Sequence, residues 1–380
     1  MIYLDHAATS FPKAPGTARA VARFLDEAAG NPGRGGHRLT VAASRAVEGC
    51  RDAVASLLGA DPERTLLGPG ATFWLNTLLA GLLRPGDRVV VSALEHNAVM
   101  RPLRHLEESA GVAVRVVEAA HPWGVPTPEE FAAAVAEAPT RLAVVAHASN
   151  VSGAVLPVEG IARAVAPVPV IADGAQAAGA VPLDFERSGL AAYVASGHKG
   201  LLGPPGTGVL LLSEALAGSL PPLVRGGTGS RSESEAMPDW LPDRLEAGTP
   251  NAAGFAGLAE AVRWLAREGV AAVHERTLEL ARRLAHGLAG ASGIRLHGWL
   301  EDEPRVATVS FTAEGADTGE LAARLDREYG VMVRPGLHCA PAAHRRLGTF
   351  PSGTLRAGIG PFLSEAAIDA AVDAVRDALR

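Results

Sequence analysis

Lys199 lies among small residues, and its amine is the strongest candidate nucleophile in this sequence. It ends the segment Ser-Gly-His-Lys, directly follows the apolar run 191–195 and precedes a glycine-rich turn at 200–208. A lysine that bonds covalently to a carbonyl cofactor must be held at one position, and small neighbours let the cofactor approach. A solvated loop lysine explains this segment alone equally well.

Asp173 follows the apolar run 168–172, one strand-helix unit before Lys199. The end of an apolar strand is where open α/β sheets bind their ligands. A carboxylate there could pair with a pyridinium nitrogen and keep it protonated, which makes the ring an electron sink. Aspartate also caps helices, so a helix N-cap remains the alternative. The spacing between Asp173 and Lys199 favours the site.

Three further segments combine polar or small residues with strand or helix ends. Residues 68–72, Gly-Pro-Gly-Ala-Thr, precede a helical run from Phe73 and could offer backbone N–H groups to a phosphate, although no GxxxxGK[ST] motif occurs. Glu-His-Asn at 95–97 and His-Ala-Ser-Asn at 147–150 each follow an apolar run. A lone histidine in such a loop is more often simply hydrogen-bonded, and a plain capped helix fits 68–72 equally well.

Cys339 lies in a short loop flanked by Gly and Pro, whereas Cys50 belongs to a helical run and is expected to pack in the core. A free thiol has a pKa of about 8.5, which nearby cations lower. Candidate cations are His338, Arg334 and Arg356. A zinc site made of Cys339, His338 and His344 is the alternative, but these residues lack a second ligand pair at finger-like spacing, so we expect no metal.

These residues need a scaffold of alternating strands and helices, and the first two thirds of the chain predict one. The strand candidates are 88–92, 113–117, 142–146, 168–172 and 208–212. Several of them are apolar throughout, as strands covered on both faces tend to be. Helical patterns at 40–58, 128–137 and 158–165 lie between them. The alternation predicts an α/β fold with a mostly parallel sheet.

A Gly-, Pro- and Ser-rich stretch at 220–250 reads as loop and separates this part from the rest. A long helical segment follows at 252–288, then strands at 306–311, 331–334 and 354–359 and a closing helix from Ser364. We therefore predict a large domain over 16–250, and a smaller α+β domain over 251–380 that includes the N-terminal segment 1–15.

Composition narrows the functional classes. The chain has 380 residues, 48% hydrophobic and 20% charged, with a formal net charge of -6, so a compact protein without a nucleic-acid partner is expected. Two cysteines exclude a disulfide scaffold and favour a reducing compartment. We see no signal peptide and no run of about 20 apolar residues, so we expect a cytoplasmic protein that does not enter a membrane.

Taken together and in order, the motifs resemble the class V aminotransferase superfamily of pyridoxal 5'-phosphate (PLP) enzymes. Within it they are most similar to the group II cysteine desulfurases. The resemblance runs nearly end to end, through YLDHAATS, NPGRGGHRLT, GAT, EHNAVMRPL, HASNVSGAVLP, DGAQAAG, SGHKGLLGPPGTG, EAGTPN and RPGLHCAP. It implies PLP fold type I, whose large domain holds a mostly parallel seven-stranded sheet.

The resemblance also implies a role for each site residue. Lys199 would bind PLP covalently and then move protons, Asp173 would pair with the pyridine nitrogen, and His96 would stack on the ring. Cys339 would attack the sulfur of L-cysteine and carry it as a persulfide, and Arg356 would bind the substrate carboxylate. Gln176 and Asn150 would lie near the phenolic oxygen of PLP and the substrate. The phosphate would be held by Ala71, Thr72, Ser196 and His198, joined by Thr249 from a neighbouring subunit of a homodimer.

The chain departs from the family pattern in two places. His6 follows Asp5 where Asn is more usual, and Phe73 and Trp74 replace the usual Glu-Ala. The resemblance implies the conversion of L-cysteine to L-alanine, with sulfur passed to an acceptor, for which a sulfur-acceptor protein is the candidate. The alternatives are selenocysteine lysis or transamination on the same cofactor, and a non-catalytic scaffold that binds sulfur carriers. The thiol of Cys339 favours the desulfurase, because transamination needs no thiol.

Overall fold

A seven-stranded sheet forms the centre of the larger part of the protein. The structure is a computed structural model that describes residues 1–33 and 35–380, so Arg34 of the NPGRGGHRLT segment lies outside the described residues. The strand order is β2-β8-β7-β6-β5-β3-β4. Neighbouring strands pair in parallel except on the two sides of β8. The predicted mostly parallel seven-stranded sheet is confirmed.

The strands have the following bounds: β2 Thr65–Gly68, β3 Arg88–Ser92, β4 Ala113–Val117, β5 Leu142–Ala146, β6 Val170–Asp173, β7 Ala192–Ser196 and β8 Gly208–Leu212. Five of the seven strands were predicted. One of the five is β6, for which the predicted run 168–172 begins two residues and ends one residue before the strand. The register of β6 matters for function, because Asp173 is its last residue and not a residue beyond it.

Helices cover both faces of the sheet, which explains why its strands are mostly apolar. On β3, Val90 packs in one core while Val89 and Val91 pack in the other. The first core contains side chains from α2 (Arg38–Leu58), α5 (Pro128–Ala136), α6 (Val158–Ala164) and α9 (Ala252–Glu268), and the second contains those of α3 (Ala71–Leu82) and α4 (Asn97–Ala110). Short helices α7 (Phe185–Ser188) and α8 (Glu214–Ala217) complete this part.

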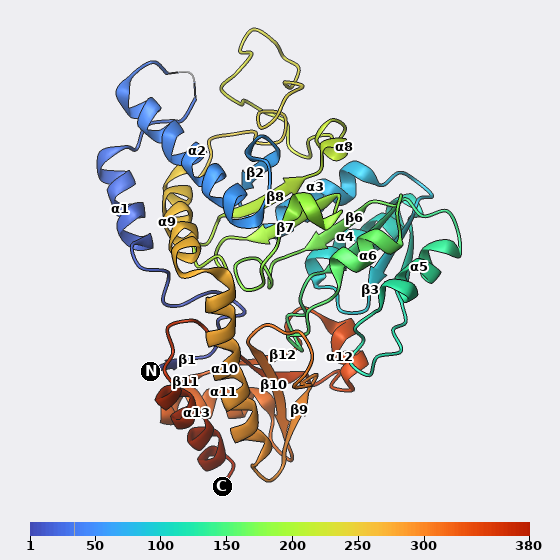
Figure 1. The fold of residues 1–380 in the computed structure, drawn as a ribbon, viewed down its shortest axis with the longest axis vertical. Helices are drawn as coiled ribbons and strands as arrows, with labels where there is room; N and C mark the ends of the chain where they lie inside the picture. Colours follow the sequence, from blue (N-terminus) through green and yellow to red (C-terminus); the bar gives the residue numbers. More distant parts are fainter. Residues whose placement is uncertain (34) are drawn as a thin grey trace.

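A four-stranded antiparallel sheet of order β12-β13-β10-β9 forms the smaller part. Its strands are β9 Ile294–His297, β10 Thr308–Ala313, β12 Arg334–Gly336 and β13 Thr354–Gly358. It packs in a third core with α10 (Val270–Ala289), α11 (Thr318–Tyr329) and α13 (Glu365–Ala378). The N-terminal strand β1 (Ile2–Tyr3) pairs with β11 (Val331–Met332), so both chain termini lie beside this sheet (Figure 1).

The segment 252–288, predicted as one long helical stretch, is helical but divided into two helices. Gly269 separates α9 from α10 with φ 81°, a left-handed backbone conformation that side chains other than glycine rarely adopt. Helix α9 packs against α1 (Thr17–Glu27) and α2, whereas α10 packs against α13 and the small sheet (Figure 1). The domain boundary that we predicted at 250 stays a prediction, and this packing favours placing it at Gly269 instead.

Residues 220–250 contain no helix or strand, as predicted for this loop. A buried ion pair fixes its far end, because Arg51 Nη1 lies 2.7 Å from Glu246 Oε1. The same carboxylate oxygen accepts the backbone N–H of Leu67 on β2 at 2.7 Å. The loop is therefore anchored to the sheet immediately before Thr249.

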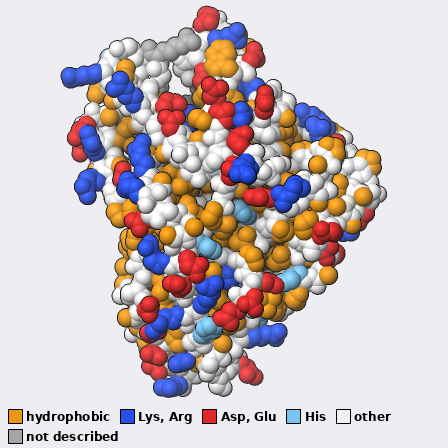
Figure 2. All heavy atoms as spheres, viewed as in Figure 1, with side chains coloured by type: hydrophobic (Ala, Val, Ile, Leu, Met, Phe, Trp, Pro, Cys, Tyr) orange, Lys and Arg blue, Asp and Glu red, His pale blue; other side chains and the backbone are white. Residues whose placement is uncertain are grey.

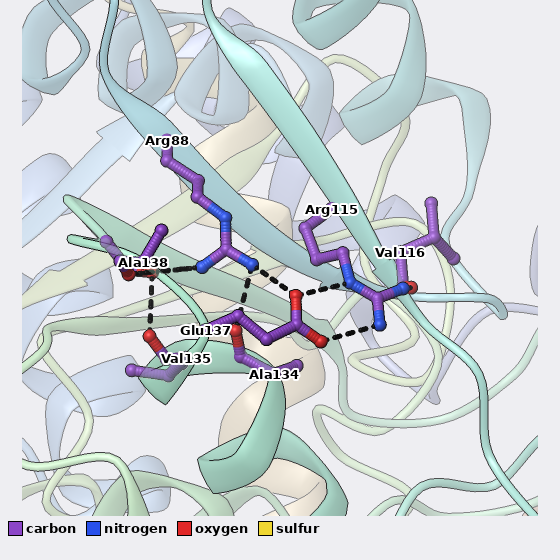
Figure 3. Close-up of polar contacts among 8 residues, drawn as sticks. Arg88, Arg115, Val116, Ala134, Val135, Glu137 and Ala138 are labelled. Atoms are coloured by element: carbon purple, nitrogen blue, oxygen red, sulfur yellow. Dashed lines mark hydrogen bonds and ion pairs between the residues drawn. The ribbon is translucent and has the colours of Figure 1, made fainter.

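Strand β4 is one edge of the large sheet, and ion pairs hold α5 beside it. Glu137, directly after α5, accepts from Arg88 on β3 at 2.8 Å and from both Nε and Nη2 of Arg115 on β4 at 2.8 Å (Figure 3). Arg115 Nη1 also donates to the carbonyl of Val116 at 2.6 Å. These contacts tie the end of α5 to the last two strands.

Acidic and basic side chains are interspersed on the face drawn in Figure 2. Among the described residues, no helix combines the length and the apolar character that crossing a membrane requires.

Candidate active site

Lys199 lies in the loop after β7, where the protein surrounds most of its side chain. Burial lowers the pKa of its amine, and the neighbouring charges of Arg356 and Arg334 lower it further, while Asp173 opposes the shift. The lysine also lines a cavity together with His6 and Gln176. A lowered pKa favours the neutral amine, which is the form that can act as a nucleophile. The solvated-lysine interpretation is therefore wrong.

Asp173 ends β6 and is only 5% exposed. Its Oδ1 accepts the backbone N–H of Ala175 at 3.0 Å, and burial raises the pKa of the carboxyl group. The next residue must be glycine, because a Cβ on Gly174 would lie 2.1 Å from the Tyr193 ring. A buried carboxylate near an amine suits the stabilisation of a positive charge. Asp173 caps no helix, since α7 begins only at Phe185.

Tyr193 and His147 form a hydrogen-bonded pair next to Asp173. This pair was not predicted from the sequence. The hydroxyl of Tyr193 lies 3.0 Å from His147 Nδ1, and the backbone N–H of His147 donates to the carbonyl of Asp173 at 2.9 Å. Burial lowers the pKa of His147 to about 4, so its imidazole is neutral at pH 7. His147 is thus a supporting residue in the core rather than a group open to substrate.

His96 is the N-cap of α4, where its Nδ1 accepts the N–H of Ala98 at 3.0 Å. Burial and the charges of Lys199 and Arg356 lower its pKa to about 4. A neutral ring has a flat apolar face, which is suited to stacking on an aromatic cofactor. The capping bond holds the ring in one orientation.

The N-terminus of α3 is suited to holding a phosphate. The helix begins at Ala71, and its N-cap Gly70 supplies no side-chain hydrogen bond to the first turn. Backbone N–H groups and the helix dipole at such an end favour an anion. A Cβ on Gly208 would lie 2.4 Å from the Gly70 Cα, so the start of β8 closely approaches this loop. Thr72 is exposed on the same turn.

Ser196 and His198 flank the Lys199 loop on the same sheet edge. Ser196 ends β7, and His198 Nδ1 lies 3.1 Å from the hydroxyl of Thr9. The carbonyl of His198 accepts from the side chains of Ser10 at 3.0 Å and Lys13 at 3.1 Å. The N-terminal segment therefore holds the Lys199 loop in place, a contact that sequence reasoning missed.

Thr249 does not share a cavity with Lys199 of its own chain. It is exposed and lines a separate cavity with Pro69 and Phe73. Trp74 is fully buried and packs edge to face against Phe73, with ring centroids 4.9 Å apart. The unusual Trp74 thus belongs to the core, and Phe73 faces the cavity of Thr249.

Cys339 is exposed and free, while Cys50 is fully buried with its pKa raised to about 12 by that burial. Cys339 lines a cavity of about 440 Å3 with His96 and Thr72. Its φ of 57° and that of His338, 48°, lie in the left-handed region, which costs about 1–3 kcal/mol per residue. Two neighbouring residues hold the loop that contains His338 and Cys339, through hydrogen bonds to its backbone carbonyls.

Those neighbours are Asn97 and Asn150. The backbone N–H of Asn97 donates to the carbonyl of Cys339 at 2.8 Å. Nδ2 of the buried Asn150 donates to the carbonyl of His338 at 2.6 Å, and its Oδ1 has no partner. Asn150 therefore supports the cysteine loop, whereas Gln176 Nε2 donates to the carbonyl of Ala7 at 2.9 Å.

Arg356 on β13 is 2% exposed and joins the two sheets. Its Nη1 donates to the carbonyl of Asn150 at 2.9 Å, and its Nη2 lies 3.2 Å from Asp5 Oδ1. Its Nε is buried without a partner. A substrate carboxylate could therefore still gain a hydrogen bond from this guanidinium. Asp5, its carboxylate partner, was not predicted.

The histidines of the zinc alternative are engaged elsewhere. His338 Nε2 lies 3.1 Å from the Thr354 hydroxyl, and His344 Nδ1 lies 2.7 Å from the Thr349 hydroxyl. Within residues 1–33 and 35–380, no three His, Cys, Asp or Glu side chains are grouped to hold a metal ion.

Comparison with known proteins shows the family of the chain. The family model Aminotransferase class-V matches residues 2–371. A probable cysteine desulfurase of Methanothermobacter thermautotrophicus is 34% identical over 94% of this chain and 90% of its own length. One from Xylella fastidiosa is 34% identical over 90% of this chain and 82% of its own length. The chain therefore belongs to the class V aminotransferase family.

Solved structures show the same fold. The apo structure of a cysteine desulfurase from Thermococcus onnurineus superposes with a TM-score of 0.92 at 27% identity, covering 99% of this chain and 94% of that one. A cysteine desulfurase from Escherichia coli gives 0.87 at 29% identity with the same coverage. The fold is PLP fold type I.

PLP is the cofactor of this family, and the residues present fit it. Lys199 has a lowered pKa, Asp173 is a buried carboxylate, and the neutral ring of His96 is fixed in one orientation. The N-terminus of α3 has no side-chain cap, so its backbone N–H groups can hold the phosphate.

Proposed function

We propose that the protein is a PLP-dependent cysteine desulfurase. It converts L-cysteine to L-alanine, retains the sulfur as a persulfide on Cys339 and passes it to an acceptor. The observation that carries the proposal is the position of Cys339, which is an exposed thiol in the same cavity as His96. A transaminase needs no thiol there.

Arg356 is proposed to bind the substrate carboxylate. Its guanidinium is buried, held by Asp5 and the carbonyl of Asn150, and retains a free Nε. A fixed arginine of this kind orients a carboxylate through charge-assisted hydrogen bonds. The bound substrate would then present its α-carbon and its sulfur in a defined direction.

Lys199 is proposed to bind the cofactor and then to move the proton of the α-carbon. When bound, PLP supplies an electron sink for charge that develops on the substrate. Asp173 would favour a protonated ring nitrogen from its buried position, and the lowered pKa of Lys199 makes its amine able to accept a proton. His96 would limit the motion of the ring by stacking.

Cys339 is proposed to take the sulfur. Its thiolate Sγ attacks the substrate sulfur, the bond between that sulfur and the β-carbon breaks, and the electron pair stays with the carbon. Protonation of that carbon completes alanine, and Cys339 carries the extra sulfur as a persulfide. One cysteine and one thiol thus give one alanine and one persulfide, without an external oxidant.

The direct test is to incubate the purified protein with L-cysteine and dithiothreitol and to measure alanine and sulfide. We expect both products in equal amounts. Pyruvate or a transamination product without alanine would replace the proposal by another class V reaction. No turnover, together with binding of sulfur-carrier proteins, would favour the scaffold. Selenocysteine lysis is the remaining alternative, and parallel turnover of both amino acids measures the preference.

We further propose a homodimer in the cytoplasm. Thr249 is exposed and lies away from its own Lys199, which supports a role for Thr249 and residues 226–230 at the phosphate of a neighbouring subunit. Both cysteines are free, and a reactive exposed thiol such as Cys339 suits a reducing compartment. An acceptor protein for the sulfur belongs to the same proposal.

A further inference from the structure

A cleft lined by arginines adjoins the Cys339 loop on its outer side. We call it the arginine cleft. It lies between α4 and α12 (Pro341–Leu347), has a volume of about 730 Å3 and is lined among others by Arg101, Arg104, Arg345 and Arg346. Arg101 also lines the cavity that contains Cys339, whereas Arg104, Arg345 and Arg346 do not.

The arginine cleft is joined to the reactive thiol by short stretches of chain. Pro341 and Ala342, which follow Cys339 by two and three residues, line the cleft. Asn97 lines it too, and the backbone N–H of Asn97 donates to the carbonyl of Cys339 at 2.8 Å. The 440 Å3 cavity that contains Cys339 shares Asn97, Arg101 and His105 with the cleft. The two spaces are neighbours along α4.

Positive charge dominates the cleft, although the whole chain carries a net charge of -6. Arg101 is exposed, and its side chain makes no hydrogen bond or ion pair with any residue that the structure describes. Arg345 is exposed over the ring of Phe350, 4.6 Å from its centroid. Arg346 donates to the carbonyls of Ala119 and His121, so no acid neutralises it.

The acidic residues of the cleft do not cancel this charge. Arg104 is paired with Glu107, and Glu108 and Glu118 add two carboxylates to the lining. The third glutamate, Glu95, is 1% exposed, and burial raises its pKa to about 8. Glu95 is thus largely uncharged at pH 7. Apart from Arg104, which Glu107 neutralises, three arginines face the remaining two carboxylates of the lining.

We propose, on the basis of the desulfurase function above, that the arginine cleft binds an acidic segment of a protein acceptor whose thiol receives the sulfur from Cys339. The acceptor thiolate attacks the outer sulfur of the Cys339 persulfide, the S–S bond to Sγ breaks, and Cys339 leaves as a thiolate. The acceptor becomes the persulfide, and no electron or atom is left over.

The arrangement of the two spaces suits an extended segment, because they adjoin one another along α4. The cleft of about 730 Å3 opens beside the further 440 Å3 at Cys339. An extended peptide could fill both, with acidic side chains at the arginines and its thiol at Cys339. Complementary charge of this kind mainly raises the rate of encounter.

The test uses two peptides with one central cysteine, one flanked by glutamates and one by lysines. The enzyme is loaded with L-cysteine, and mass spectrometry follows persulfide transfer to each peptide. Arg101→Glu and Arg345→Glu should slow transfer to the acidic peptide about tenfold and leave the basic peptide unaffected or faster. Arg163→Glu changes an exposed arginine on α6 that does not line the cleft, so it is the control and should change neither rate.

Equal effects of the two variants on both peptides, or no effect, would overturn the arginine cleft as the docking site. Alanine production with dithiothreitol as acceptor separates this result from a failure of the desulfurase proposal, because it needs no docking. A second measurement needs no turnover at all. The acidic peptide with serine in place of cysteine should bind the unloaded protein by fluorescence anisotropy, and the two variants should lose this binding.

Discussion

Asp5 Oδ1 lies 3.2 Å from Arg356 Nη2, although 351 positions separate these two residues in the chain. The N-terminal segment thus supplies a fixed carboxylate to the residue that we expect to bind the substrate carboxylate. Arg334 also approaches Asp5, at 3.6 Å from its Oδ2, but it is half exposed. Substitution of Arg356 and substitution of Asp5 should therefore weaken substrate binding by different amounts.

Arg356→Lys should reduce kcat/KM for L-cysteine about 10- to 100-fold, because an ammonium cannot reproduce the planar donor set of a guanidinium. Asp5→Asn should mainly raise KM, by less than that, since Arg356 keeps the carbonyl of Asn150 as a partner. Steady-state kinetics decides, with Arg163→Gln at an exposed position on α6 as the control. Unchanged KM in both variants would remove Arg356 from substrate binding.

Lys199→Ala should lose the covalent bond to PLP. The wild-type protein should be yellow, and borohydride should fix one PLP per chain to Lys199. The chain has only one other lysine, Lys13, whose Nζ donates to the hydroxyl of Ser10 at 2.8 Å and whose pKa burial lowers to about 8. Lys13→Ala is therefore the natural control, and peptide mapping that finds PLP on Lys13 would contradict the assignment.

Cys339→Ala should separate sulfur removal from the earlier steps. The variant should bind PLP and still change its absorbance when cysteine is added, yet lose nearly all alanine formation. Cys50→Ala should keep alanine formation, because Cys50 is fully buried in the core. Selenium leaves more readily than sulfur, so Cys339→Ala should retain activity on selenocysteine. Wild-type rates of alanine formation in Cys339→Ala would end the persulfide mechanism.

Stability should fall on the acid side because of buried neutral histidines. The pKa of His147 is about 4 in the folded state and 6.5 in the ordinary case. As the pH drops below 6.5, the unfolded chain binds a proton first, so stability is lost between pH 6.5 and 4. This single group accounts for about 2 kcal/mol at pH 5.

His147→Asn can retain a polar contact with the Tyr193 hydroxyl but has no such titration. It should unfold in less urea than wild type at pH 7 and lose about 2 kcal/mol less between pH 7 and pH 5. The control is His105→Asn at an exposed position, which should leave the loss of stability between pH 7 and pH 5 unchanged. If His147→Asn lost as much stability as the wild type between pH 7 and pH 5, this histidine would not be the titrating group.

Thr249 should act across a subunit interface. Sedimentation should show a dimer, and Thr249→Ala should bind PLP more weakly. Mixed dimers of Thr249→Ala and Lys199→Ala subunits contain one site with both residues intact if Thr249 acts on its neighbour. Such mixtures should regain activity that neither parent has. Activity that never exceeds the sum of the parents, or a fully active monomer, would refute this arrangement.

The strands were predictable because most of their apolar residues are buried, and four of them match the sequence prediction to the residue. Strand β2 was missed, since it is short and is paired only with β8, far along the chain. The helical pattern at 252–288 gave no sign of the break at Gly269, because apolar residues keep their spacing on both sides. A positive φ is visible only in the structure.

Site residues at strand ends were predictable for the same reason that the strands were. Lys199, Asp173 and His96 each follow or end an apolar run, so the sheet brings them to one edge. Asp5 and Tyr193 were missed because their roles come from tertiary contacts, with Arg356 and His147 respectively. No spacing in the sequence encodes a pair that meets only after both sheets have formed.

The contacts of Glu137 protect the edge strand β4 from pairing with a strand of another molecule. An unprotected edge strand offers unpaired N–H and C=O groups to any other strand and so invites edge-to-edge association. On β4, Arg115 places a charge on the edge, occupies the carbonyl of Val116 and is fixed by Glu137 (Figure 3). A second chain that added a strand here would have to displace an ion pair. The seven-stranded sheet is thereby protected at this edge from growth into an aggregate.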